Sequence, residues 1–104
     1  GSSHRNAMTY TLRVSLPIHH LNFMDTNLLR TIADEAAHTW GGSFLSGLGE
    51  GRWGKEGAED CYLLTVDMPK YDPAEVRRFL LWVKAALSQK VVHATVTPTE
   101  IVEV

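Results

Sequence analysis

The chain has 104 residues, enough for about one domain, and its single cysteine excludes an internal disulfide framework or a cysteine-rich zinc site. Ten Lys and Arg against 12 Asp and Glu give a net charge of -2, which argues against non-specific binding to nucleic acid. No apolar run approaches the ~20 residues of a membrane span, and no secretory signal opens the sequence. These features predict a soluble, cytoplasmic α+β domain without a membrane partner.

The first seven residues differ in character from the rest of the chain. Gly1-Ser2-Ser3-His4 is typical of the remnant of a cleaved expression tag, and Met8 is interpreted as the native start. The sequence therefore predicts a tag remnant over residues 1–7 and a single domain over residues 8–104.

Two elements are predicted before the first glycine pair. Residues 10–16 alternate between apolar and polar side chains, which is typical of a half-buried strand, and Pro17 ends this strand. A helix follows, capped by Asp25 or Thr26, and Gly41-Gly42 ends it because glycine adopts the left-handed C-terminal conformation without a steric clash. The apolar stripe of this helix consists of Leu29, Ile32, Ala33, Ala36 and Trp40.

A hairpin is predicted in the middle of the chain. A short edge strand over residues 43–48 leads into a glycine-rich loop or bulged hairpin around residues 50–53. The strand over residues 60–68 is apolar on both sides in its first half, so we expect it in the centre of the sheet.

The clearest predicted element is a second helix. Asp72 is its expected N-cap, Pro73 occupies the first helical position, and Glu75 is placed to close a capping box. Its core stripe consists of Val76, Phe79, Leu80, Val83 and Leu87. A last strand is expected over residues 90–97 and ends at Pro98, with residues 100–104 as a candidate for a short terminal strand.

The order β-α-β-β-α-β, joined by right-handed crossovers, predicts a ferredoxin-like α+β sandwich. In that fold an antiparallel sheet carries both helices on one face, and the first and third strands are central. The other face of the sheet must then meet solvent, a ligand or a second subunit.

Three ionisable side chains are expected on that second face. Alternation along the strands places Arg13, Asp67 and His93 there, together with Thr65 and Thr95. These groups could bind a small polar ligand or serve acid–base chemistry. The alternative, which we favour, is a solvated face on which opposite charges pair across strands.

Other chemical signals in the sequence are weaker. His19-His20 would point to opposite sides of an extended segment, and His38 has only Asp34 near it, so no metal site and no cofactor are predicted. No neighbour in sequence activates Cys61, which is interpreted as a buried or edge thiol. The G-x-G-x-G run at residues 47–51 lacks the strand–helix context of a phosphate-binding loop.

Binding to RNA and self-association were weighed from the aromatic and apolar residues. An RNA-recognition sheet needs exposed aromatic residues on its central strands, and Tyr62 alternates with the core set, so no nucleic-acid partner is expected. Leu81 and Trp82 add apolar surface to the second helix, as do Leu63 and Trp53 elsewhere, and this indicates a homodimer interface. The alternative is that Trp53 folds back as a lid on its own core.

Three short motifs carry a resemblance to known proteins. They are Gly41-Gly42-Ser43-Phe44, Gly49-x-Gly51-x-Trp53, and Gln89-Lys90-Val91-Val92 before the last strand. Over residues 10–104 the chain resembles small uncharacterised bacterial proteins, many from mobile genetic elements such as phages, plasmids and gene cassettes. Thr39-Trp40 stands where that group would have Arg-Phe. The group has no established activity, so the resemblance assigns no catalytic residue.

Two classes of function follow from these observations. We favour a homo-oligomeric binding or interaction module whose ligand is a small polar molecule or whose partner is a protein. The alternative is a cofactor-independent enzyme, since the topology is also similar to the dimeric α+β barrels that include cofactor-free monooxygenases. In the enzyme, Arg13 would hold an anion, and His93 or Asp67 would be the base. Its pocket would lie between the open sheet face and the loop that carries Glu50, Arg52 and Trp53.

Overall fold

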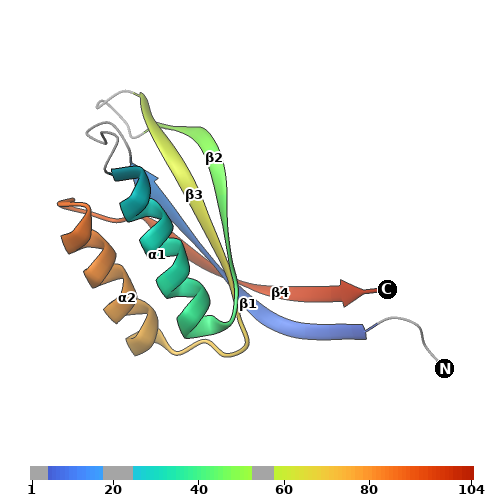
Figure 1. Cartoon of the computed structure of the whole chain (residues 1–104). Helices are drawn as coiled ribbons and strands as arrows, with labels where there is room; N and C mark the ends of the chain where they lie inside the picture. Colours follow the sequence, from blue (N-terminus) through green and yellow to red (C-terminus); the bar gives the residue numbers. More distant parts are fainter. Residues whose placement is uncertain (1–4, 18–24, 53–57) are drawn as a thin grey trace.

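The computed structural model describes residues 5–17, 25–52 and 58–104, which form a four-stranded antiparallel sheet with two helices on one face (Figure 1). The elements follow the order β1 (Arg5–Pro17), α1 (Asp25–Trp40), β2 (Ser43–Arg52), β3 (Ala58–Met68), α2 (Pro73–Ala86) and β4 (Ala94–Glu103). The strand order is β2-β3-β1-β4, so β1 and β3 are central. The predicted ferredoxin-like sandwich is confirmed.

The hydrophobic core lies between the helices and the even-numbered residues of the central strands. Six strand side chains have no exposed surface: Leu12, Val14, Leu16, Leu64, Val66 and Met68. The helices bury Leu29, Ile32, Ala36, Trp40, Val76, Phe79, Val83 and Leu87 against them. Both predicted helical stripes are therefore confirmed, and burying each Leu or Val contributes about 1.5–3 kcal/mol.

The ends of the helices follow the predicted signals with one correction. α1 ends at Trp40, and Gly41 adopts a φ of 96°, where a side chain would be strained. At the start of α2, the Asp72 carboxylate accepts a hydrogen bond of 3.0 Å from the backbone N–H of Ala74. The capping box was predicted wrongly, because the Glu75 carboxylate bonds to the indole of Trp40 instead. Capping of α1 by Asp25 or Thr26 falls on side chains outside the described set.

The predicted end of the last strand at Pro98 is also wrong, because β4 continues through this residue to Glu103. The backbone N–H of Ser15 donates to the carbonyl oxygen of His93 at 3.0 Å, so odd-numbered residues of β1 hydrogen-bond to β4. Pro98 pairs with Tyr10, an even-numbered residue. Its nitrogen therefore faces the outer edge of the sheet, where no donor is required.

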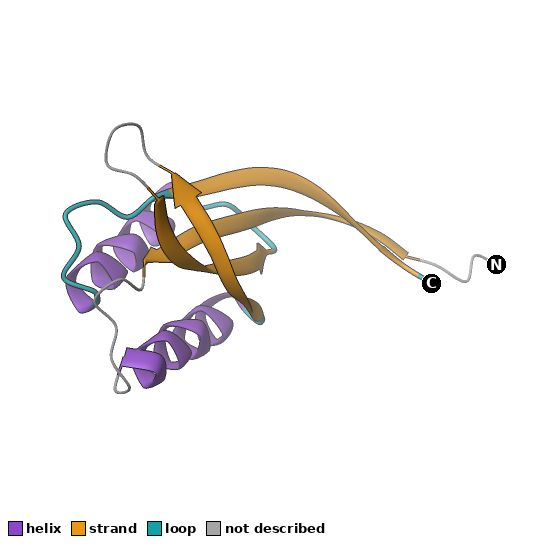
Figure 2. Cartoon of the chain, turned by 90° about the horizontal axis from the view of Figure 1, so that it is seen from above, coloured by secondary structure: helices purple, strands orange, loops and turns teal. Residues whose placement is uncertain are grey.

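β1 and β4 continue beyond the rest of the sheet as a two-stranded ribbon. They pair over their whole length from Arg5↔Glu103 to Val14↔Ala94, whereas β3 joins β1 only from Tyr10 onward. We call residues 5–10 and 98–103 the arm. It points away from both helices, and Arg5 pairs with Glu103 at its tip (Figures 1 and 2). The assignment of residues 1–7 to a tag remnant stays a prediction.

The arm makes the molecule elongated. Its principal extents are 52 × 25 × 24 Å, and the radius of gyration is 15.0 Å. A compact domain of this length would have a radius of gyration of about 13 Å. The edge strand β2 is longer than predicted and reaches Arg52, with an irregular register between Ser46 and Gly49. Neither α1 nor α2, the helices of the described part of the chain, has the length and apolarity needed to cross a bilayer.

Candidate functional site

The sheet face turned away from the helices is rich in hydroxyl groups and carries the three predicted ionisable residues; we call it the open face. The strand registers place its side chains in rows across the sheet. The central row is Phe44, Thr65, Arg13 and Thr95. The row on one side is Ser46, Leu63, Ser15 and His93, and that on the other side is Asp67, Thr11 and Thr97. The predicted placement of Arg13, Asp67 and His93 on one face agrees with this register.

Arg13 occupies the middle of the central row. Its side chain is exposed, and it forms no hydrogen bond or ion pair with any residue that the structure describes. Thr65 and Thr95 lie on the neighbouring strands directly beside it. A guanidinium with this freedom donates two parallel hydrogen bonds to a carboxylate, a bicarbonate or a phosphate.

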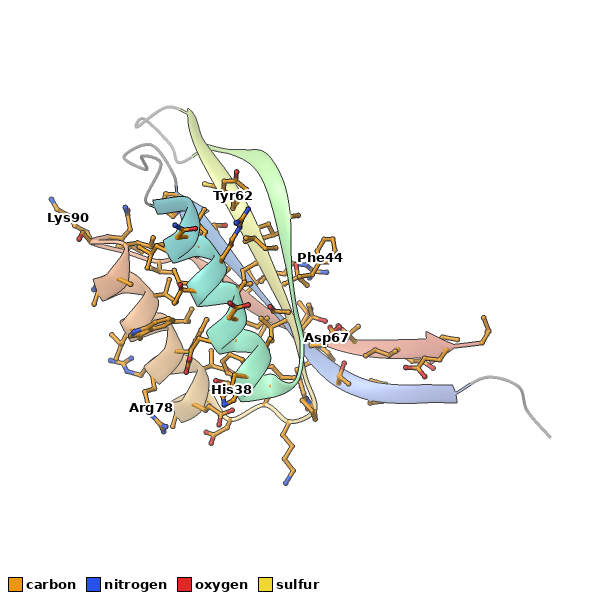
Figure 3. All side chains as sticks on the ribbon, in the orientation of Figure 1. His38, Phe44, Tyr62, Asp67, Arg78 and Lys90 are labelled. Atoms are coloured by element: carbon orange, nitrogen blue, oxygen red, sulfur yellow. The ribbon has the colours of Figure 1, made fainter. Side chains whose placement is uncertain are left out.

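Phe44 stands at the end of the same row on the edge strand. It is 68% exposed and projects from β2 on the side away from the helices (Figure 3). β3 separates it from Arg13, so the backbones of the two residues are roughly 10 Å apart. The row therefore presents an aromatic surface and a cation with hydroxyl groups between and beside them.

Asp67 is held by a hydrogen bond within the sheet. The Thr11 hydroxyl, which is only 2% exposed, donates to Asp67 Oδ1 at 3.2 Å. Thr11 Oγ1 also lies 2.5 Å from Thr99 Oγ1. Each hydroxyl has one proton, and Thr99 Oγ1 also lies 3.4 Å from the carbonyl oxygen of Thr97, so either threonine can donate in the bond between the two hydroxyl groups. The chain of hydroxyl groups satisfies a buried polar atom and gives Asp67 a structural partner.

The three ionisable residues do not converge on one point. Asp67 and His93 lie on strands that flank β1, four residue steps apart in register. Strand spacing and rise put their Cα atoms roughly 16 Å apart. A general base must come within about 3 Å of the proton it removes, so these two groups cannot act on the same atom. Asp67 and His93 therefore do not form one acid–base pair, and each lies in a row next to that of Arg13.

For several predicted site residues the structure does not describe the side chains. Trp53 and the His19-His20 pair lie outside the described residues, and Glu50 and Arg52 are described by their backbone alone, as partners of Asp60 and Ala58. A ligand-binding role for these loop residues stays a prediction. Within the described ranges, no three His, Cys, Asp or Glu side chains form a group that could hold a metal ion.

The outer surface of α2 carries the predicted interface residues. Leu81 is 51% exposed and Trp82 is 39% exposed. Trp82 packs on Phe79 with ring centroids 6.0 Å apart, and Phe79 meets Trp40 edge-on. A groove of about 460 Å³ between the helices is lined by Glu35, Thr39, Glu75, Arg78, Phe79 and Trp82.

Sequence reasoning missed two features of this surface chemistry. From the sequence, Phe44 was noted only as part of a glycine motif. Ser43 and Leu45 lie on the helix side of β2, so alternation along this strand would have placed Phe44 on the open face. The arm was missed because Pro98 was interpreted as the end of a strand.

Comparison with known proteins supports the fold. No protein-family model and no curated protein matches the sequence. Among solved structures, the chain is similar to CPII from Thiomonas intermedia K12, a nitrogen regulatory PII-like protein bound to ADP, AMP and bicarbonate. The TM-score is 0.59 at 13% identity, over 93% of this chain and 96% of that one. The apo form of CPII gives the same TM-score at 12% identity, over 97% and 99% of the two chains.

Proposed function

We propose that the chain is a small-molecule-binding module that works as a homo-oligomer and takes an anionic ligand on the open face. Arg13 carries this proposal, because it is exposed, lacks a partner among the described residues and lies between two threonines. The likeness to CPII, whose structure holds ADP, AMP and bicarbonate, makes adenine nucleotides and bicarbonate the first ligands to test.

The side chains of the central row suit the anionic group and the base of such a ligand. The Arg13 guanidinium would hold a phosphate or bicarbonate through two hydrogen bonds, and the hydroxyl groups of Thr65 and Thr95 add donors and acceptors at its sides. The exposed ring of Phe44 would stack on a base. The separation of roughly 10 Å across the strands suits a ligand with its planar ring at one end and its negative charge at the other.

Binding is favoured over catalysis because Asp67 and His93 lie on opposite sides of Arg13 and do not pair with each other. Asp67 is engaged by Thr11, and His93 lies in the opposite neighbouring row. Among the described side chains of the open face, Phe44 alone is aromatic, which is too few for an RNA-stacking surface, and the partly buried Tyr62 packs against the core. A cytoplasmic location and an origin among bacterial mobile-element proteins belong to the same proposal.

Titration calorimetry with ADP, AMP and bicarbonate in turn tests the ligand site. We expect saturable binding of at least one of them by the wild type and by Arg30→Gln, an exposed arginine on α1. Arg13→Gln should weaken that binding by about tenfold or more, because a bidentate charged contact is lost. Equal affinity of Arg13→Gln and Arg30→Gln, or no binding of any of the three ligands, would overturn the proposed site.

The oligomer in this proposal is a homodimer that uses the exposed apolar surface of α2. Trp82→Glu places a charge at the centre of that surface without touching the open face. Light scattering over a concentration series should give twice the chain mass for the wild type and the chain mass for Trp82→Glu. A wild-type monomer at all concentrations would overturn the homodimer and leave the ligand site to be judged by calorimetry.

A further inference from the structure

The apolar stripe that β1 turns toward the helices continues into the arm, where neither α1 nor α2 covers it (Figure 1). Leu16, Val14 and Leu12 are fully buried, whereas Tyr10 is 36% exposed and Met8 is 68% exposed. On the partner strand, Val102 is 58% exposed on the same side of the ribbon. Tyr71 packs on Tyr10 at the root of the arm, with ring centroids 5.7 Å apart. The stripe is thus built as a core surface but ends without a covering layer.

A ribbon of this kind needs further contacts to be stable. Two strands alone are marginal in water, and three or more strands or a packed helix are normally required. Large apolar side chains gathered on one exposed face mark a surface that another element covers. The arm points away from its own helices, so they cannot supply that element (Figures 1 and 2).

The outer surface of α2 has the complementary character. Leu81 and Trp82 are exposed, and Arg77 and Arg78 lie one turn before them on the same side of the helix. Arg78 extends from α2 away from the sheet (Figure 3). Within the described residues, neither arginine forms an ion pair. This surface therefore offers an apolar centre with unpaired positive charges beside it.

On the apolar side of the arm the charge has the opposite sign. Glu100 and Glu103 of β4 are both exposed, but Glu103 pairs with Arg5 and lies on the other face of the ribbon, so Glu100 is the carboxylate beside the apolar stripe. Glu100 pairs in register with Met8, so a carboxylate and the most exposed apolar side chain of β1 lie together. Apolar character and charge thus match between two surfaces that one molecule cannot bring into contact.

We propose that the arm of one copy docks on the outer surface of α2 of a second copy. Met8, Tyr10 and Val102 would pack on Leu81 and Trp82, and Glu100 would face Arg77 and Arg78. In a two-fold dimer the arm of each copy docks on α2 of the other copy, so the contact forms twice. This inference rests on the homo-oligomer of the proposed function and identifies the contact that forms it. The open face stays free for a ligand.

Charge reversal tests the proposed pairing. Light scattering and sedimentation equilibrium would compare the wild type, Glu100→Lys, Arg77→Glu/Arg78→Glu and the variant with all three changes, with Glu103→Lys on the other face of the arm as the matched control. Glu100→Lys and the double arginine variant should each weaken dimerisation by about tenfold or more, because like charges then face each other across the contact, and the control should dimerise like the wild type. The triple variant should return to within about threefold of the wild type, because the charges are complementary again.

Apolar contacts are tested by Met8→Asn/Val102→Asn, with Val91→Asn as the matched control. Val91 is 75% exposed, and its neighbour Lys90 lies at the end of the molecule opposite the arm (Figure 3). The arm variant should be a monomer with an unchanged circular dichroism spectrum, and the control should remain a dimer.

The outcomes separate the two proposals. A wild-type monomer would overturn the homo-oligomer and the arm contact together. A dimer that Trp82→Glu dissociates, but that the arm variants leave intact, would overturn the arm contact alone. Failure of the triple variant to recover, while Glu100→Lys and the double arginine variant both dissociate, would overturn the pairing of these particular charges.

Discussion

The indole Nε1 of Trp40 donates a hydrogen bond of 2.7 Å to Oε1 of Glu75, which joins the last residue of α1 to the first turn of α2. Trp40 is only 7% exposed, so its indole N–H needs an acceptor within the protein. A buried N–H group without a partner costs about 1–3 kcal/mol, which explains why Glu75 serves the neighbouring helix rather than its own N-cap.

Replacing Glu75 tests the importance of this hydrogen bond. Glu75→Ala should lower the free energy of unfolding by about 1–3 kcal/mol, whereas Glu75→Gln, which keeps an acceptor oxygen, should lose less than half of that. Urea denaturation at one fixed protein concentration measures both. Equal losses for the two variants would show that the hydrogen bond is not the cause.

The hydroxyl chain under Asp67 gives a second stability prediction. Thr11→Val keeps the shape of a buried side chain but removes the link between Asp67 and Thr99, so it should cost about 1 kcal/mol of unfolding free energy. Thr95→Val is the control, since Thr95 is exposed on the same face and its hydroxyl makes no hydrogen bond to a described residue. A larger loss for the control would contradict this interpretation.

The glycine pair after α1 allows a matched test of backbone conformation. Gly41 has a φ of 96°, and a Cβ atom would meet nothing within 4 Å at either Gly41 or Gly42. Gly41→Ala should therefore destabilise the fold by about 1 kcal/mol through backbone strain, while Gly42→Ala should be close to neutral. Thermal denaturation of the two variants, side by side, distinguishes strain from steric contact. A neutral Gly41→Ala would contradict this account.

Phe44 should influence nucleotides more than bicarbonate. Phe44→Ala removes the surface proposed to stack on a base, so affinity for ADP and AMP should fall by about fivefold or more, in keeping with about 1–3 kcal/mol per stacked base. Bicarbonate has no ring and should bind as before. Because Phe44 is 68% exposed, the unfolding free energy should change little. A parallel loss of bicarbonate affinity would contradict a stacking role.

The sequence was sufficient where the signals are local. The helices were predicted because Asp72, Pro73 and Gly41 act on their own neighbours in the chain, and because apolar residues repeat at helical spacing. The central position of β3 followed from its apolar residues on both sides. These signals also placed Arg13, Asp67 and His93 on one face.

Features that depend on distant parts of the chain were missed. Pro98 is tolerated in β4 only because its nitrogen faces the outer edge, and the pairing with β1 decides this. The Trp40–Glu75 bond depends on how the two helices pack. The alternation that predicts a buried stripe continues into Tyr10 and Met8, but the helices end before it. Local sequence patterns cannot predict these features, because each depends on contacts between distant parts of the chain.

Backbone amide spectra recorded by NMR during a titration with ADP test the central claim most directly. If the open face is the ligand site, the largest chemical-shift changes should fall on Phe44, Thr65, Arg13 and Thr95, and Arg13→Gln should remove them at the same ADP concentration. No change up to millimolar ADP, or changes confined to residues of the α1–α2 groove such as Glu35 and Trp82, would contradict the account.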